Sequence, residues 1–178
     1  MIFSMMISLF KISFWKLLFL NRIKVSPIQS FHMSFKINSY RKGKIQIGKG
    51  MKCRRGCSLI SDSGQLVIGN NVFMNQNVMI TCEKSIIIED LVTIANNVVI
   101  VDHDHDYVKD VNQETSFVTD DVFIGQNTWI GANVVILKGT HIGKDCVVAA
   151  GTIVRKGTYP DKSVIYDKRD TICIERRV

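Results

Sequence analysis

The sequence has few residues that interrupt or crosslink a chain. Only two of its 178 residues are proline, which excludes collagen-like and proline-rich classes. Its five cysteines are scattered: Cys53, Cys57, Cys82, Cys146 and Cys173. An odd, scattered set does not indicate a disulfide framework, and no second pair completes a zinc site with Cys53 and Cys57. We therefore expect reduced thiols that fill small spaces in the core of a cytoplasmic protein.

Aromatic residues are also scarce, at 8%, and they are not interleaved with the basic residues. A stacking platform for single-stranded nucleic acid is therefore not expected. The 23 Lys and Arg residues outnumber the 16 Asp and Glu residues, giving a net charge of +7. This excess favours an anionic partner, such as a phosphorylated cofactor, a membrane surface or nucleic acid. With 46% hydrophobic and 22% charged residues, the chain is expected to fold as one domain with a short appendage.

Residues 1–24 form the only segment that resembles a targeting signal. The stretch from Met1 to Leu20 is very apolar, but Lys11 and Lys16 interrupt it, and Arg22 and Lys24 follow. A secretory signal has its positive charge before the apolar run, which is not the order here. A spanning helix has few internal charges, so the two lysines argue against one. Two interpretations stay open: a basic amphipathic helix in peripheral contact with an anionic bilayer, and a helix packed on its own domain or a neighbouring subunit.

A six-residue period dominates the rest of the chain. From residue 124 onward every sixth residue is aliphatic: Ile124, Ile130, Ile136, Ile142, Val148 and Val154. Shorter blocks upstream repeat the pattern at Ile47, Cys53 and Leu59, at Ile68, Met74 and Ile80, and at Ile88, Ile94 and Ile100. Glycine often follows the aliphatic residue, and asparagines fall where a tight turn is needed. The period predicts short strands that turn a corner every six residues and stack into a solenoid.

The pattern fails between Ile100 and Ile124. This stretch is rich in acidic residues and holds two of the four histidines, His103 and His105. A polar loop that interrupts a regular solenoid often carries the functional residues. We expect an N-terminal helical segment at residues 1–40, a β-helix domain at residues 41–160 with a protruding loop at residues 101–121, and a tail at residues 161–178.

The repeats resemble those of the hexapeptide-repeat acyltransferases with a left-handed parallel β-helix, and most of all the galactoside, maltose and capsular-polysaccharide O-acetyltransferases. The motifs that carry the resemblance are residues 122–131 (VFIGQNTWIG), 134–143 (VVILKGTHIG) and 147–156 (VVAAGTIVRK), with residues 75–80 (NQNVMI) and 94–100 (IANNVVI) upstream. The resemblance covers about residues 66–160. It implies an all-β fold, a homotrimer, acetyl-CoA bound between neighbouring β-helices, and a sugar or glycan acceptor.

The resemblance also assigns roles to single residues. His105 falls on the catalytic histidine, and Trp129 falls on the tryptophan beside it. Imidazole suits a general base near neutral pH, because its pKa is about 6.5. Asn75 falls on a substrate-lining asparagine, and Glu83 falls where relatives place an acceptor-binding carboxylate. His103 matches no family base, and we expect it in the loop as an acceptor-binding residue. The expected cofactor-binding residues are Trp129, Ala132, Ala150, Arg155 and Lys156.

These residues lead us to expect an acetyl-CoA-dependent O-acetyltransferase that modifies a capsule, lipopolysaccharide or exopolysaccharide sugar. We expect no metal and no nucleic-acid partner, and a cytoplasmic location, at the inner face of the membrane if residues 1–24 contact it. The alternatives are N-acetylation of a nucleotide-linked amino sugar, a zinc-dependent β-helix and a non-catalytic scaffold. Zinc would need three converging imidazoles, and besides the pair in the loop only His32 and His141 remain.

Overall fold

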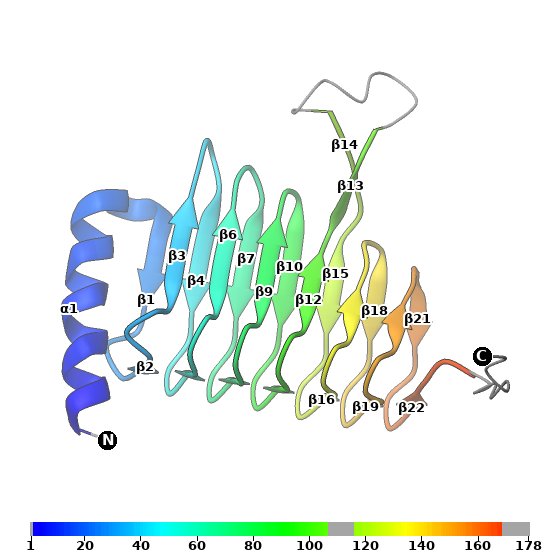
Figure 1. Cartoon of the computed structure of the whole chain (residues 1–178). Helices are drawn as coiled ribbons and strands as arrows, with labels where there is room; N and C mark the ends of the chain where they lie inside the picture. Colours follow the sequence, from blue (N-terminus) through cyan, green and yellow to red (C-terminus); the bar gives the residue numbers. More distant parts are fainter. Residues whose placement is uncertain (1, 107–115, 169–178) are drawn as a thin grey trace, which may run out of the picture.

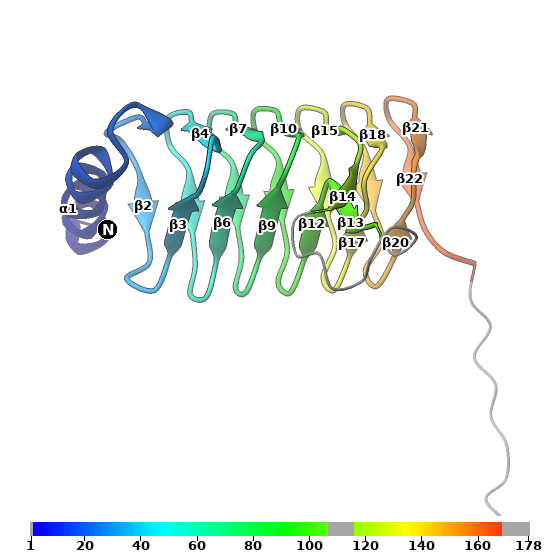
Figure 2. The same cartoon turned by 90° about the horizontal axis from the view of Figure 1, so that it is seen from above.

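The computed structural model describes residues 2–106 and 116–168 as a parallel β-solenoid with one helix at its N-terminal end (Figure 1). The chain winds through three flat sheets, which we name A, B and C, and returns to sheet A at the start of each coil. Viewed from above, the coils stack in a row, and an antiparallel hairpin leaves the row part-way along it (Figures 1 and 2). The expected hexapeptide-repeat β-helix with a short N-terminal helix and a protruding loop is confirmed.

The solenoid is preceded by helix α1 (Ile2–Phe19) and the short 3-10 helix η1 (Leu20–Arg22). Sheet A contains β1 (Ile23–Val25), β4 (Lys44–Ile47), β7 (Gln65–Ile68), β10 (Ser85–Ile88), β15 (Val122–Ile124), β18 (Thr140–Ile142) and β21 (Gly157–Tyr159). Sheet B contains β2 (Ser30–Phe31), β5 (Lys52–Cys53), β8 (Phe73–Met74), β11 (Thr93–Ile94), β16 (Trp129–Ile130), β19 (Val147–Val148) and β22 (Val164–Ile165). Sheet C contains β3 (Lys36–Ser39), β6 (Ser58–Ser61), β9 (Met79–Cys82), β12 (Val99–Val101), β17 (Val135–Ile136) and β20 (Ile153–Val154). The hairpin consists of β13 (His103–His105) and β14 (Phe117–Thr119).

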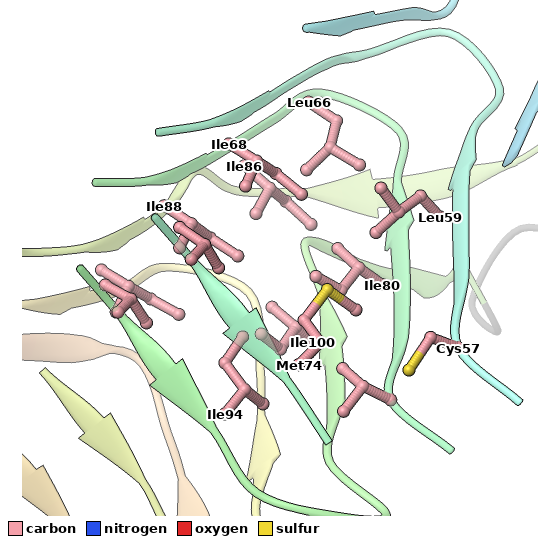
Figure 3. Close-up of a cluster of buried hydrophobic side chains, with 14 of the residues drawn as sticks. Cys57, Leu59, Leu66, Ile68, Met74, Ile80, Ile86, Ile88, Ile94 and Ile100 are labelled. Carbon is pink, nitrogen blue, oxygen red and sulfur yellow. The ribbon is translucent and has the colours of Figure 1, made fainter. Parts of the chain in front are cut away.

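The six-residue columns of the sequence are the core of the solenoid. In sheet C, for example, Ile80, Ile100 and Ile136 are parallel partners on successive coils and are fully buried. Figure 3 shows such side chains meeting along the axis from all three sheets. Burying one branched side chain from each face of each coil supplies the main stabilising free energy. Cys53, Cys57, Cys82 and Cys146 are buried free thiols, as expected, whereas Cys173 lies outside the described residues.

Asparagines build the corner between sheets B and C, which we call the asparagine corner. Asn77, Asn97 and Asn133 have left-handed backbone with φ of 58°, 58° and 57°. The side-chain amide of Asn77 donates to Asn97 Oδ1 at 3.2 Å, and that of Asn97 donates to Asn133 Oδ1 at 3.1 Å. Asparagine tolerates this backbone, so the same residue makes the turn and ties each coil to the next.

The solenoid extends beyond the expected bounds of residues 41–160 at both ends. Its first coil begins at Ile23, and β22 lies within residues 161–178. The reason is coil length, because the early coils are longer than the later ones. Ile23 pairs with Ile45, whereas Phe123 pairs with His141, which is a shorter step along the sequence. Extra residues at the corners break the six-residue period in the early coils, so the sequence pattern did not identify the first coil.

Helix α1 covers the open end of the solenoid (Figure 1). The ring of Trp15 lies 6.0 Å from that of Phe31 and 5.8 Å from that of Phe35, while Ser8 Oγ accepts a hydrogen bond from the amide of Phe31 at 2.8 Å. The helix therefore packs on its own domain, which is one of the two interpretations that the sequence left open. In the described part of the chain, no helix is both long and apolar enough to cross a membrane.

Leu91 provides a test of the corner geometry. It has left-handed backbone (φ 62°), between Asn71 (φ 55°) and Asn127 (φ 57°) in the neighbouring coils, and it is largely exposed. Left-handed backbone costs an ordinary residue about 1 kcal/mol. We expect Leu91→Asn to raise the thermal midpoint by about 2–4 °C in a calorimetric scan. Leu91→Ala keeps the Cβ and should give no such gain; equal stabilisation by alanine would contradict the backbone explanation.

Candidate active site

The hairpin leaves the solenoid at the corner between sheets C and A, which we call the hairpin corner. Here β12 ends, β13 and β14 pair antiparallel, and the chain re-enters sheet A at β15. The stretch lacks the aliphatic residue that each six-residue unit places in the core, so it leaves the stack without disturbing it. The expected loop at residues 101–121 is at this position, and residues 107–115 of it lie outside the described residues.

The two imidazoles of the hairpin lie against one aromatic ring. Residues alternate along β13, so His103 and His105 share a face of the hairpin. Their ring centroids lie 5.0 Å and 4.9 Å from that of Phe117 on β14. His105 is exposed, whereas the side chain of His103 is 14% exposed. Phe117 restricts both rings, and the sequence analysis missed it because it falls where the repeat fails.

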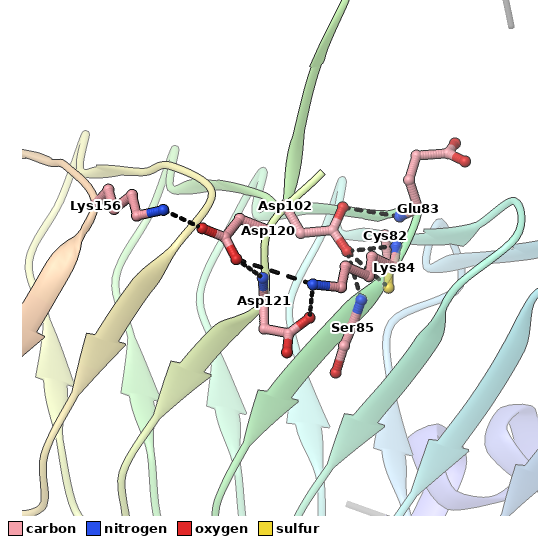
Figure 4. A network of polar contacts seen from close by, with 8 residues as sticks. All are labelled: Cys82, Glu83, Lys84, Ser85, Asp102, Asp120, Asp121 and Lys156. Atoms are coloured by element: carbon pink, nitrogen blue, oxygen red, sulfur yellow. Dashed lines mark hydrogen bonds and ion pairs between the residues drawn. The ribbon is translucent and has the colours of Figure 1, made fainter. Parts of the chain in front are cut away.

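A buried carboxylate holds the base of the hairpin. Asp102 is fully buried and accepts hydrogen bonds from the backbone amides of Glu83, Lys84 and Ser85, each at 2.8 Å (Figure 4). His103 Nδ1 lies 3.1 Å from its Oδ1. Burial alone would raise the pKa of Asp102, but hydrogen bonds from His103 and the backbone amides outweigh it and lower the pKa. The six-residue pattern does not single out Asp102, although strand alternation after the buried Ile100 and the outward Val101 indicates an inward position.

Lysines and acids of different coils pair along the same corner. Lys156 Nζ lies 2.7 Å from Asp120 Oδ2, and Lys84 Nζ lies 3.1 Å from Asp121 Oδ1 (Figure 4). The contact with Lys156 lowers the pKa of Asp120, and the contact with Asp121 raises the pKa of Lys84. Lys156 and the neighbouring Arg155 are exposed, so their charged groups are accessible to an anionic ligand.

Two further contacts shape the corner around the hairpin. Lys138, from the turn between β17 and β18, donates to Asp104 on β13 and so ties the hairpin to the next coil. Glu83 donates its backbone amide to Asp102, but its carboxylate points away from that network (Figure 4). Burial and the nearby Asp62 raise the pKa of Glu83, while His103 opposes the shift. Glu83 is therefore close to the imidazoles and faces outward.

The other residues of the expected site lie elsewhere in the same chain. Asn75, Ala132 and Ala150 lie at the asparagine corner, and Trp129 lies on the outer face of sheet B, where its side chain is 53% exposed. The strands of sheet C separate this group from His103, His105, Glu83, Arg155 and Lys156, by roughly 20 Å of extended chain in each coil. One chain therefore brings together five of the nine expected site residues along one corner, and leaves four apart from them.

A basic groove of about 640 Å³ runs along the start of the hairpin corner. Arg22, Arg41, Lys42, Lys44 and Lys84 line it together with the small residues Ser63 and Gly64. Arg41 is paired with Asp62 at 3.3 Å. The groove ends beside Glu83, so an anionic ligand bound here would lie next to the candidate site. Among the described side chains, no three His, Cys, Asp or Glu residues are placed to share a metal ion.

Two family models match the solenoid. The bacterial transferase hexapeptide model (six repeats) matches residues 121–156, and the model of the hexapeptide repeat of succinyl-transferase matches residues 65–101. Residues 65–101 and 121–156 are therefore similar to the hexapeptide repeats of bacterial transferases. Because both models describe transferases and one is named for a succinyl-transferase, they support an acyltransferase. No curated protein sequence gives a significant match to the chain.

Two solved structures, with TM-scores above 0.5, agree with the fold of this chain. A variant of AntD, an N-acyltransferase from Bacillus cereus in complex with dTDP and coenzyme A, superposes with a TM-score of 0.62 at 19% identity, covering 87% of this chain and 80% of that one. A hexapeptide transferase family protein from Anaplasma phagocytophilum gives 0.52 at 14% identity, covering 80% and 76%. A maltose O-acetyltransferase from Clostridium difficile is 25% identical over 74% of this chain and 65% of its own, with a TM-score of 0.46.

The buried carboxylate gives a prediction for stability. Asp102→Asn replaces one acceptor oxygen by a donor that faces backbone amides, so we expect the free energy of unfolding at pH 7 to fall by about 3 kcal/mol. Because the pKa of Asp102 is lowered on folding, its contribution is complete above the ordinary aspartate pKa of about 3.9 and is lost as the pH falls through the folded-state value. Urea unfolding should therefore show the variant approaching the parent below about pH 4.

The exposed Asp104 offers the matched control for this measurement. Asp104→Asn removes a surface ion pair with Lys138 and should cost less than about 1 kcal/mol. A stability difference between parent and Asp102→Asn that stays constant from pH 7 to pH 3 would show that the charge of Asp102 is not what stabilises the corner.

Proposed function

We propose that the protein is an acetyl-CoA-dependent O-acetyltransferase that acts on a sugar hydroxyl of a glycan in the cytoplasm. The observation that carries the proposal is the pair of imidazoles on a hairpin of a transferase-type solenoid, beside a row of exposed basic residues. His105 is the general base of the proposal, because its ring is exposed and is supported by Phe117.

The reaction moves one acetyl group and one proton. His105 takes the proton from the acceptor hydroxyl, whose oxygen attacks the carbonyl carbon of the thioester. The carbon–sulfur bond breaks, and the sulfur leaves with the proton that the imidazolium returns. The products are the sugar ester and the free thiol of coenzyme A. His103, held by Asp102, is the rival base on geometry, since a carboxylate that orients an imidazole is a common arrangement for proton transfer.

The proposed binding residues divide between the two corners. Arg155 and Lys156 would hold cofactor phosphates at the hairpin corner, since Lys156 can exchange Asp120 for a phosphate oxygen. Trp129, Ala132 and Ala150 would contact the cofactor arm, and Asn75 and Glu83 would contact the acceptor. Because the two groups lie apart in one chain, a single site that contains both needs residues from two subunits. The proposal therefore includes the homotrimer.

The basic groove supports a second candidate, N-acetylation of a nucleotide-linked amino sugar. Five Lys and Arg residues line the groove, the last of them Lys84, next to Glu83 in the sequence. Their positive charges suit the phosphates of a nucleotide-linked sugar better than they suit a neutral glycan. AntD, which shares the fold, has been solved with dTDP-4-amino-4,6-dideoxyglucose and coenzyme A. A neutral acceptor would leave these charges without a role in catalysis.

Thiol release from acetyl-CoA tests both candidates in one assay. The purified chain is incubated with acetyl-CoA and either neutral oligosaccharides or nucleotide-linked amino sugars, while light scattering reports its oligomeric state. Thiol release with neutral sugars supports O-acetylation, and release with amino-sugar nucleotides alone supports the second candidate. A trimer that is inactive on both panels, or a monomer of about 20 kDa, would contradict the proposal.

Alanine variants separate the two histidines. We expect His105→Ala to lower kcat by about 10²–10⁴-fold, the usual range for loss of a general base, while acetyl-CoA binding and the oligomeric state stay intact. His103→Ala should cost much less activity. Thermal midpoints of both variants control for unfolding. Full activity in His105→Ala would end the proposed mechanism, and a large loss in His103→Ala alone would assign the base to the Asp102–His103 pair.

Lys156 tests the cofactor side of the site. Removing one charge-assisted contact to phosphate costs about 1.5–3 kcal/mol, so Lys156→Ala should raise the KM for acetyl-CoA about tenfold or more and leave the acceptor KM unchanged. Lys144→Ala, another exposed lysine, is the control and should change neither value. An unchanged KM for acetyl-CoA in Lys156→Ala would leave this residue only its ion pair with Asp120.

A further inference from the structure

The outward face of helix α1 carries many large apolar side chains. Among the α1 residues whose side chains the structure describes, the exposed ones are Met5, Met6, Leu9, Phe10, Ser13, Phe14, Leu17 and Leu18, of which only Ser13 is polar. At 100° per residue they cover roughly 220° of the helix surface. Phe10 is 76% exposed and Leu17 is 80% exposed, although the opposite face of the same helix packs on the solenoid. Monomeric soluble proteins rarely expose a continuous apolar surface of this kind.

An apolar groove extends this face onto the first coil. It has a volume of about 680 Å³ and lies between α1 and residues that include Met33, Phe35 and Ile37. Lys11 and Lys36 also line it, and the half-buried Lys11 donates from its Nζ to the carbonyl of Phe35 at 2.7 Å. The surface therefore combines many apolar side chains with two basic ones.

The charge of the chain is concentrated at the same end. Residues 1–61 contain 12 of the 23 Lys and Arg residues and none of the 16 Asp and Glu residues, of which the first is Asp62. Lys24 and Lys36, both exposed, belong to the first coil, directly behind α1. Lys44 and Lys52 belong to the second coil, about 4.8 Å further along the stack. Because α1 is about 10–12 Å in diameter, Lys24 and Lys36 lie about a Debye length, roughly 10 Å, from a surface that takes up the outward half of α1, and Lys44 and Lys52 lie one coil spacing beyond them.

From this arrangement we propose that the N-terminal end of the solenoid docks on an anionic phospholipid bilayer. Helix α1 lies across the end of the stack (Figures 1 and 2), so a bilayer that receives its outward face meets the molecule end-on. The exposed apolar side chains enter the boundary between headgroups and acyl chains, and the lysines of the first two coils face the anionic headgroups. A second copy of this chain is the weaker occupant, because two ends that both carry a large positive charge repel each other.

Vesicle flotation with the purified full-length chain tests this docking. We expect the protein to float with phosphatidylcholine vesicles that contain about 30% phosphatidylglycerol, and at least tenfold less with pure phosphatidylcholine, since each lysine near the surface contributes about a factor of five. Raising the salt concentration should release it. Light scattering without vesicles reports self-association in parallel.

Matched variants assign the contact to the two parts of the surface. Phe10→Glu with Leu17→Glu should lower vesicle binding at least tenfold, because burying either side chain is worth more than a factor of ten. The control is Val164→Glu with Tyr166→Glu, two exposed apolar residues at the far end. Lys24→Glu with Lys36→Glu should weaken binding about tenfold or more, while Lys144→Glu with Lys168→Glu should not.

All four positions in α1 and the first coil are exposed, so these variants should keep the thermal midpoint of the parent. No flotation with anionic vesicles, equal flotation with neutral ones, or binding that the Phe10 and Leu17 substitutions leave unchanged would overturn the proposal. Self-association that the same substitutions abolish, without vesicle binding by the parent, would assign the surface to a second copy. None of these readouts depends on acetyl transfer.

Discussion

The hydrogen bonding of each coil to the next is the constraint on which the rest of the structure depends. A parallel strand stack satisfies its backbone groups only if every coil repeats the path of the one before it. Each face must then place one side chain in the core at the same height, as Ile80, Ile100 and Ile136 do in sheet C. Residues that cannot meet this condition must leave at a corner, and this requirement puts the polar hairpin outside the stack.

The same constraint separates the two places where the molecule meets other molecules. The corners can vary in length and sequence because insertions there leave the hydrogen bonds between coils intact. The imidazoles, the ion pairs and the basic groove all lie at the hairpin corner. The ends of the solenoid are different, since an open coil exposes both its core and its backbone groups. Helix α1 closes one end with Ile12 and Trp15, and its other face remains available for a partner.

The sequence predicted what is local and periodic. The aliphatic columns, the tight corners and the position of the hairpin follow from spacing alone, because each depends on the six-residue repeat. The first coil was missed because the extra residues at its corners hide the period. The six-residue pattern does not single out Phe117 and Asp102, because their roles depend on contacts across the hairpin and with the preceding coil. The separation of Trp129 from His105 follows from the path of the chain around each coil. Matching single positions to a family motif does not show this path.

A rigid stack also sets the height of the hairpin above the end of the molecule. The hairpin leaves after β12, in the fourth coil, so three coil spacings, about 15 Å, separate it from the first coil. If α1 lies on a bilayer, its own diameter of about 10 Å adds to this spacing, and the rigid stack holds the hairpin at a fixed height of about 25 Å above the surface. The basic groove begins at Arg22, next to α1, and ends at Lys84, beside the hairpin corner. Its course from α1 to the hairpin corner supports the second candidate of the proposed function, an acceptor that carries phosphate, since a neutral sugar would not use these basic side chains.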